Sequence, residues 1–95
     1  MADLSLLLTP TDVERSLAQR LRAARKSRGW TQEELASRSG LGVATVARLE
    51  RNGQGQLRSL VLLCAALGRL DTFDGVLAEA PPTSLEELRR RRGSG

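Results

Sequence analysis

The chain has no histidine, no tyrosine and a single cysteine, Cys64, among its 95 residues. One thiol cannot form a disulfide within the chain, and too few ligands of the right type are present for a zinc site. Cys64 falls on the apolar stripe of a predicted helix, so we expect it to be a small core residue. The lack of disulfides fits a reducing cytoplasm, where we expect the protein to reside. We predict no metal and no cofactor.

Catalytic constellations are missing as well. The sequence offers no histidine, no usable thiol arrangement, no glycine-rich phosphate loop after a strand and no isolated carboxylate pair in a plausible pocket. We therefore predict that the chain is not an enzyme. No apolar run approaches the length of a transmembrane helix, and the Leu4–Leu8 cluster is too short, and lacks the basic flank, for a signal peptide. We expect no membrane partner.

Positive charge, by contrast, is abundant and is carried almost entirely by arginine. The formal net charge is +4, and the isoelectric point is near 10.9. Lys26 is the only lysine among the 15 basic residues. Arginine is the better bidentate partner for phosphate and for guanine. This composition favours an anionic partner, although charge says nothing about the fold.

A chain of this length makes one domain with a modest core, whose stability dimerisation would increase. We divide it into an N-terminal arm (1–10), a helical domain (11–79), and a linker with a basic tail (80–95). The leucines of the arm form either a short strand paired with a second subunit or a tail packed on the core. The run Arg89–Arg92 is either solvated or adds nonspecific attraction to phosphates.

Apolar residues at helical spacing predict an all-α domain of five helices. The first helix follows Pro10, has Thr11 or Asp12 as its N-cap and ends at Gly29. Its arginines either face phosphates or are simply solvated. Its inward positions are Val13, Leu17, Leu21 and Ala24. The fourth helix follows Leu57, Leu60, Val61, Cys64 and Leu67 to Gly68, and the fifth starts near Asp71 and buries Phe73, Val76 and Leu77.

The most informative segment is residues 31–53, which read TQEELASRSGLGVATVARLERNG. Thr31 and Glu34 have the spacing of a capping box, in which each satisfies a backbone N–H of the other. Trp30 before the cap and Leu35 after it are placed to form a hydrophobic staple. These four residues predict the start of a short amphipathic helix.

A tight glycine turn joins this helix to a second short one. Gly40 ends the first helix, because glycine adopts a positive φ without a steric penalty, and Leu41 anchors the turn to the core. Val46 and Leu49 are three residues apart and lie on the inward face of the second helix. Two helices joined in this way form a helix-turn-helix, which reads the major groove of DNA. The face left over carries Gly42, Val43, Ala44, Thr45, Ala47, Arg48 and Arg51.

The loop after the second helix, residues 52–56, is polar and rich in glycine. Its backbone N–H groups either approach a phosphate closely or belong to a plain helix connection.

The segment from about Leu21 to Leu77 resembles the phage-repressor and Cro family of helix-turn-helix regulators, also called XRE-type. The resemblance lies in Gly29-Trp30-Thr31-Gln32, Glu34-Leu35-Ala36, Gly40-Leu41, Ala44-Thr45-Val46, Leu49-Glu50 and Ala65-Ala66-Leu67-Gly68. It implies a compact five-helix domain that binds double-stranded DNA, usually as a homodimer.

The resemblance also implies roles for single residues. Gln32 would bond a phosphate beside the recognition helix, and Arg48 would contact a base or a phosphate. Glu50 would be structural, paired with Arg22 or Arg25 on the first helix. Many relatives carry polar side chains where this chain has Gly42, Val43 and Ala44. Val43 and Ala44 can touch thymine methyl groups but cannot hydrogen-bond a base, so sequence preference also depends on DNA shape.

The same segment looks like the HipB-type antitoxins, which repress their own operon and bind a kinase-fold toxin. This second resemblance lies in Gly29-Trp30-Thr31-Gln32, Ala44-Thr45-Val46 and the leucine-rich stretch Leu60 to Leu70. It implies that residues 70–92 bind a partner or a second subunit.

We therefore predict a sequence-specific DNA-binding transcriptional regulator, a dimeric autorepressor that inserts helix 42–51 into the major groove. The alternative is an antitoxin whose main role is to neutralise a toxin partner. We assign the DNA-binding surface to Arg28, Gln32, Gly42, Val43, Ala44, Thr45, Arg48, Arg51 and Asn52, and the structural capping to Thr31 and Glu34.

Overall fold

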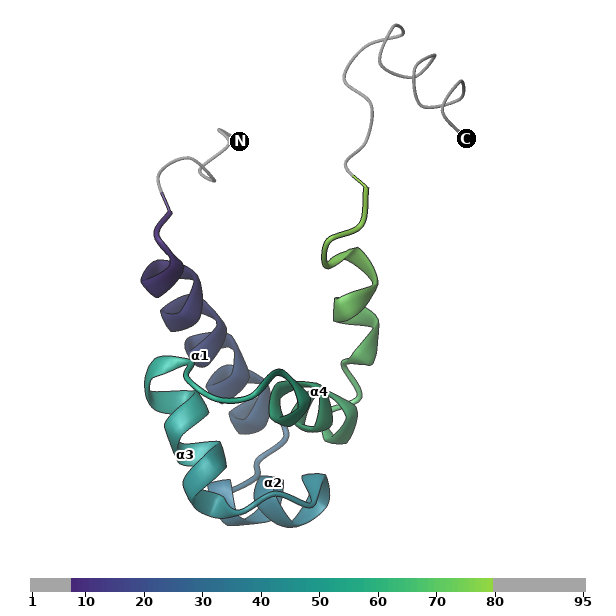
Figure 1. Ribbon diagram of the computed structural model, residues 1–95. Coiled ribbons are helices and arrows are strands. Elements are labelled where there is room, and N and C mark those ends of the chain that lie inside the picture. The colour runs from purple at the N-terminus through teal and green to yellow at the C-terminus, as the bar shows by residue number, and fades with distance from the viewer. Residues whose placement is uncertain (1–7, 80–95) are drawn as a thin grey trace, which may run out of the picture.

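The computed structural model describes residues 8–79, which form four α-helices and a 3-10 helix with no strand among them (Figure 1). The helices are α1 (Pro10–Ser27), α2 (Gln32–Ser39), α3 (Val43–Asn52), α4 (Leu57–Ala66) and the 3-10 helix η2 (Leu70–Gly75). The predicted all-α class and its five helical elements are confirmed. The predicted tail (80–95), and the predicted arm up to residue 7, lie outside the described residues.

The helices pack around a core at the α2–α3 end of the molecule. α1 packs on α3, and α2 packs on both α3 and α4, whereas η2 contacts α4. Figure 1 shows α1 and η2 rising from this core and standing apart from each other. The buried cluster joins all four α-helices and comprises Leu21, Leu35, Ala36, Val46, Leu49, Leu63 and Leu67, with Ala24, Trp30, Leu41 and Ala66 packed against it.

The start of α1 differs from the sequence prediction. Thr9, not Thr11 or Asp12, is the N-cap: its hydroxyl oxygen accepts from the Asp12 N–H at 3.1 Å, and the Thr9 N–H donates to the Asp12 carboxylate at 3.0 Å. Pro10 is the first helical residue, where its missing N–H costs nothing. The proline therefore begins the helix instead of preceding it.

The burial of the apolar residues also departs from the prediction. Val13 and Leu17 on α1 are 42% and 40% exposed, whereas Ala18, next to Leu17, is buried. α1 turns this side toward α3, and a small residue lets the two helices approach closely. The predicted burial is also wrong for Leu57 at the start of the fourth helix and for Val76 and Leu77 at the end of the fifth, because all three are exposed. In α4, Leu63 is the fully buried residue.

The connection between α3 and α4 passes very close to α1. Gly53, with φ +74°, lies against the backbone of Glu14, so that a Cβ atom there would be 2.7 Å from the Glu14 carbonyl carbon. A Cβ on Gly55 would be 2.8 Å from a methyl group of Leu49. Close packing accounts for both glycines, which favours the plain helix connection for this loop.

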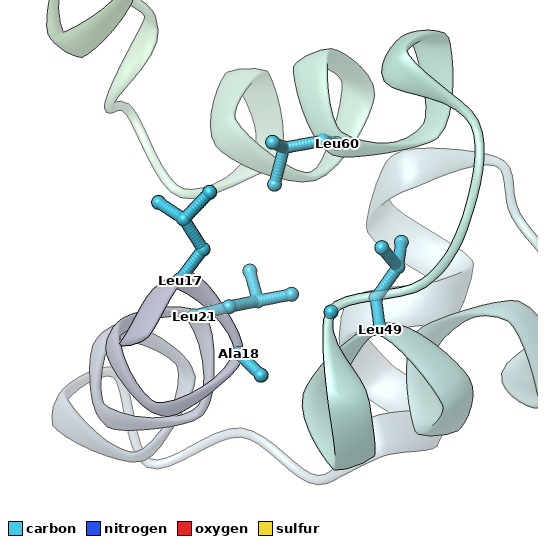
Figure 2. A pocket seen from close by; sticks show the side chains of 6 residues that line it. Leu17, Ala18, Leu21, Leu49 and Leu60 are labelled. Atoms are coloured by element: carbon cyan, nitrogen blue, oxygen red, sulfur yellow. The ribbon is translucent and has the colours of Figure 1, made fainter. Parts of the chain in front are cut away.

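A small apolar space remains where α1, α3 and α4 meet. Leu17, Ala18 and Leu21 of α1 face Leu49 of α3 and Leu60 of α4 around it (Figure 2). Its volume of about 20 Å³ is of the size that one water molecule needs. It is therefore a packing gap and not a ligand site.

Candidate nucleic-acid interface

The start of α2 has the capping geometry that the sequence predicts. The Glu34 N–H donates to the Thr31 hydroxyl and the Thr31 N–H donates to the Glu34 carboxylate, both at 3.1 Å. Trp30 packs against the core, and Leu35 has no exposed surface. The guanidinium of Arg38 lies 4.3 Å from the centroid of the Trp30 ring, within cation–π range. Thr31 and Glu34 thus form a capping box at the start of α2.

The turn between α2 and α3 is a left-handed glycine cap. Gly40 has φ +77°, and its N–H donates to the Ala36 carbonyl, as does the N–H of Leu41 at 3.0 Å. Leu41 then packs against the core. Gly42 has an extended backbone and precedes the first residue of α3. The predicted turn therefore exists, and its residues fix the direction in which α3 leaves it.

α3 is rigidly held from behind and open in front. Val46 and Leu49 are buried at 0% and 4% exposure, as predicted. Of the predicted contact residues on this helix and its turn, Thr45 and Asn52 are half-buried and the others are exposed, namely Gly42, Val43, Ala44, Arg48 and Arg51. Within residues 8–79, no hydrogen bond or ion pair occupies the guanidinium groups of Arg48 and Arg51.

A buried ion pair fixes α3 to α1. Arg25 donates from Nε to Glu50 Oε2 at 2.7 Å and from Nη2 to Glu50 Oε1 at 2.9 Å. Its third nitrogen, Nη1, donates to the Trp30 carbonyl at 2.6 Å. The hydrogen bonds to Glu50 raise the pKa of Arg25 above its ordinary value. Of the two predicted partners of Glu50, Arg25 is therefore the correct one.

Gln32 joins this network from the first turn of α2. Its Nε2 donates to Glu50 Oε1 at 3.2 Å, and its side chain is half-buried. The bond holds the Gln32 amide beside α3. The phosphate contact expected of Gln32 stays a prediction, and it now concerns a side chain that is already positioned by the scaffold.

Arg28 and Asn52 also have partners within the chain. Arg28 donates from Nη2 to the Leu67 carbonyl at 2.7 Å, and its guanidinium lies 5.4 Å from the Trp30 ring centroid. It thus ties the end of α1 to the end of α4 while its side chain stays exposed. The Asn52 Oδ1 accepts from the Gln54 N–H at 3.0 Å. Their proposed contacts with DNA remain predictions.

The four α-helices differ in how they begin. α1 and α2 have complete capping boxes and acidic residues in the first turn. α3 and α4 have Gly42 and Gln56 at their N-cap positions, neither of which makes a side-chain cap, and neither helix has an acidic residue in its first turn. Their first N–H groups and positive dipole ends therefore remain available to an anion. Arg58, in the first turn of α4 and exposed, adds charge there.

Arg58 was not among the sequence-predicted contacts. The signal that could have identified it is the absence of any capping residue around Gln56, which leaves this helix start positive.

The comparison with protein families decides what this arrangement is. A helix-turn-helix family model matches residues 21–72, which is more than half of the chain. The chain belongs to the XRE-type helix-turn-helix family. No curated protein and no solved structure matched the chain. The family is one of DNA-binding regulators, so the helix-turn-helix of this protein is a DNA-binding unit.

The match covers the elements described above and little more. It begins at the buried Leu21 of α1, includes all of α2, α3 and α4, and ends within η2. Among residues 8–79, no helix combines the length and hydropathy needed to cross a bilayer. In the same part of the chain, no group of three histidine, cysteine or acidic side chains is arranged to hold a metal ion.

Proposed function

We propose that this helix-turn-helix regulator binds specific sites on double-stranded DNA by inserting α3 into the major groove. The observation that carries the proposal is the outer face of α3, where Arg48 and Arg51 are exposed and uncommitted while Arg25 and Arg28 are used inside the fold. A rigid helix with free guanidinium groups is suited to base and phosphate contacts.

Arg48 is the proposed base-reading residue. Val43 and Ala44 can supply only apolar contacts to thymine methyl groups, so a guanine contact has to come from a longer polar side chain. A bidentate arginine–guanine pair discriminates by about 1–3 kcal/mol. We propose that five further side chains, together with the uncapped starts of α3 and α4, position the helix on the DNA backbone. These side chains are Gln32, Thr45, Arg51, Asn52 and Arg28.

The proposed regulator acts as a homodimer that represses its own operon from the cytoplasm. One short recognition helix contacts too little DNA to bind tightly at physiological salt, whereas two copies can read half-sites one helical turn apart. The footprint on the DNA upstream of the protein's own gene tests this directly. Protection of two half-sites separated by about 10 base pairs is expected, and protection of one isolated half-site would contradict the dimeric mode.

Two substitutions of Arg48 separate base reading from phosphate binding. In fluorescence-anisotropy titrations, Arg48→Ala is expected to weaken binding to the footprinted site by roughly 5- to 150-fold, with a smaller effect on random duplex. Arg48→Lys is the matched control, because it keeps the charge but loses the bidentate geometry. An equal loss on both duplexes for Arg48→Ala, with full recovery in Arg48→Lys, would make Arg48 a phosphate contact instead.

The dependence on salt tests the phosphate contacts. Binding to either duplex is expected to fall steeply with salt concentration, because each neutralised phosphate releases counterions. A shallow dependence would contradict the proposed set of backbone contacts.

The alternative function, an antitoxin that neutralises a toxin partner, rests on the resemblance of the recognition segment and the stretch Leu60–Leu70. It predicts a kinase-fold protein encoded next to this one and a stable complex between the two. A neighbouring gene of that kind would favour it, and deletion of residues 82–95 would then abolish the complex while leaving DNA binding intact.

A further inference from the structure

An apolar groove lies between α1, α4 and η2, and its volume is about 500 Å³. α1 packs on α3, whereas α4 packs on α2 and carries η2 beyond its end. Figure 1 shows that α1 and η2 stand apart. Leu17 and Leu60, labelled in Figure 2, lie on the α1 and α4 sides of the groove. Among residues 8–79, none from α3 lines it, so the groove is separate from the proposed reading helix.

The groove has the size and the lining of a site for a small molecule. Ligand pockets have volumes of about 300–1,000 Å³, mainly apolar walls and a few well-placed polar groups. Here the walls are formed by Leu17 and Ala24 of α1, by Leu57 and Leu60 of α4, and by Phe73 of η2. Leu57 is 73% exposed in the single chain, so a bound molecule can still cover it.

The uncharged polar groups of the groove do not call for a polar ligand. The Thr72 hydroxyl already donates to the Arg69 carbonyl at 2.7 Å, and the Cys64 thiol is only a weak donor. A hydroxyl or amide group placed between the leucines would therefore lose its hydrogen bonds with water and gain little in return. A hydrocarbon has no such group, so it is the ligand body that these walls fit.

The charge on the groove has one sign. Arg20 of α1 and Arg69, just before η2, both line it, whereas within residues 8–79 no acidic residue does. Both arginines are exposed, and in the same part of the chain neither guanidinium has a hydrogen bond or an ion pair. A carboxylate accepts charge-assisted hydrogen bonds from such groups. The head group that complements this groove is therefore an anion.

We propose that the groove binds a free fatty acid, with its hydrocarbon chain between the leucines of α1 and α4 and its carboxylate beside Arg20 and Arg69. Burial of the exposed apolar walls by the chain drives binding, and the two arginines select the carboxylate end. The site goes beyond the proposed DNA binding and does not depend on it. Dodecanoate is the probe, used below its micelle concentration.

The length of the hydrocarbon chain provides the first test. Isothermal titration calorimetry of the full chain with hexanoate, octanoate, decanoate and dodecanoate is expected to show binding that tightens roughly tenfold for each two added methylenes. The gain is expected to stop once the chain exceeds the length of the groove. Equal affinity for hexanoate and dodecanoate, or no binding of either, would overturn the proposal.

The head group is tested with dodecanol, which has the same chain and no charge. Arg20→Gln with Arg69→Gln is expected to weaken dodecanoate binding roughly 3- to 10-fold and to leave dodecanol binding unchanged. Both side chains are exposed, so circular dichroism is expected to show an intact fold. Arg22→Gln is the matched control, because Arg22 is exposed on α1 and does not line the groove. An equal loss for dodecanol, or no loss for dodecanoate, would overturn the proposed carboxylate site.

Cys64 reports on the groove from inside. It lines the groove, is half-buried and is the only cysteine of the chain. Burial raises the pKa of its thiol, and the nearby charge of Arg69 acts in the opposite direction. At constant pH, dodecanoate is expected to slow the reaction of Cys64 with a maleimide, whereas hexanoate at the same concentration is not. Unchanged reactivity at a saturating dodecanoate concentration would place the ligand elsewhere.

The same reaction identifies other occupants of the groove. Without ligand, protection that rises with protein concentration and resists dodecanoate would show that a second copy of the chain fills the groove. Protection that is independent of concentration and is lost on deletion of residues 1–7 would show that the chain's own N-terminus fills it. Co-sedimentation with phosphatidylglycerol vesicles, with no binding of monomeric dodecanoate, would indicate a membrane lipid instead. Each of these three results would overturn the proposal.

Discussion

The two sides of this small protein differ in how completely their side chains are buried and hydrogen-bonded. Behind α2 and α3, Leu35 and Val46 have no exposed surface, and Glu50 is fully hydrogen-bonded to Arg25 and Gln32. Within residues 8–79, no buried side-chain polar atom lacks a partner. Between α1, α4 and η2, by contrast, an apolar groove remains open and Leu77 is entirely exposed.

This difference agrees with the proposed function. If α3 is the proposed reading helix, the side behind it must be rigid within one chain, because a helix that moves cannot select a sequence. The groove side has no such requirement in the single chain, and its apolar surface is stabilised when another molecule covers it. Four predictions test this contrast, ordered from the largest expected effect.

Removal of the Glu50 carboxylate, on the well-packed side behind α2 and α3, should cause the largest loss of stability. Glu50→Ala leaves the Arg25 guanidinium buried without its partner, which we expect to cost about 3–5 kcal/mol of unfolding free energy. The measurement is urea denaturation followed by circular dichroism. Glu33→Ala, on the exposed face of α2, is the control and should change stability by no more than about 0.5 kcal/mol. Equal losses in the two variants would mean that the buried pair contributes nothing special.

Truncation of a leucine to alanine should have a large effect behind α2 and α3 and almost none beside the groove. Leu35→Ala creates a cavity in the core and should cost about 2–5 kcal/mol. Leu77→Ala removes a fully exposed side chain and should change the stability of the monomer by no more than about 0.5 kcal/mol. Both are measured at a protein concentration low enough that the chain does not associate. A large loss for Leu77→Ala there would show that the Leu77 side chain packs within its own chain.

The two turn glycines should respond differently to alanine. In Gly40→Ala the new Cβ meets open space, so only the positive φ lowers the stability, by about 1–2 kcal/mol. Gly53→Ala has the same backbone strain and also pushes a Cβ into the Glu14 backbone, which lowers the stability by about 1–3 kcal/mol more through overpacking. Thermal unfolding of the two variants provides the comparison. Indistinguishable midpoints would contradict the close approach of this loop to α1.

The smallest effect concerns the cap of α1 and depends on pH. The Thr9 N–H, and then the Thr9 hydroxyl, lower the pKa of the Asp12 carboxyl below its ordinary value. Because the folded pKa is lower than the unfolded one, the cap's contribution is present above the unfolded pKa and is lost as pH falls through the folded pKa. Asp12→Asn should therefore be slightly less stable than the wild type at neutral pH and equal to it in strong acid. A difference that stays constant with pH would contradict this account.

Much of the helix-turn-helix could be predicted because its signals are local. Thr31 and Glu34 are three residues apart, and the effect of Gly40 on α2 depends only on its own backbone angles. The same kind of signal existed at the start of α1, where Thr9 and Asp12 have capping-box spacing and Pro10 occupies the first helical position. The sequence prediction of this cap is wrong because it places Pro10 outside the helix, whereas Pro10 is the first helical residue.

Other features depend on residues far apart in the chain. The family resemblance left both Arg22 and Arg25 as partners of Glu50, and only the packing of α1 on α3 selects Arg25, 25 residues away. The exposure of Leu17 and Val76 depends likewise on the angle at which α1 diverges from α4 and η2. Helical periodicity reports that one face is apolar, but it does not report whether the chain itself covers that face.

The amino-acid sequence by itself determined where α2 and α3 begin and end and which residues stand on the outer face of α3, because caps, turns and helical faces arise from neighbours within four positions. Only the tertiary structure decided which arginine pairs with Glu50, why Gly53 must be a glycine, and that an apolar groove stays open beside α1. Those outcomes depend on how whole helices approach one another, and no local pattern encodes that distance.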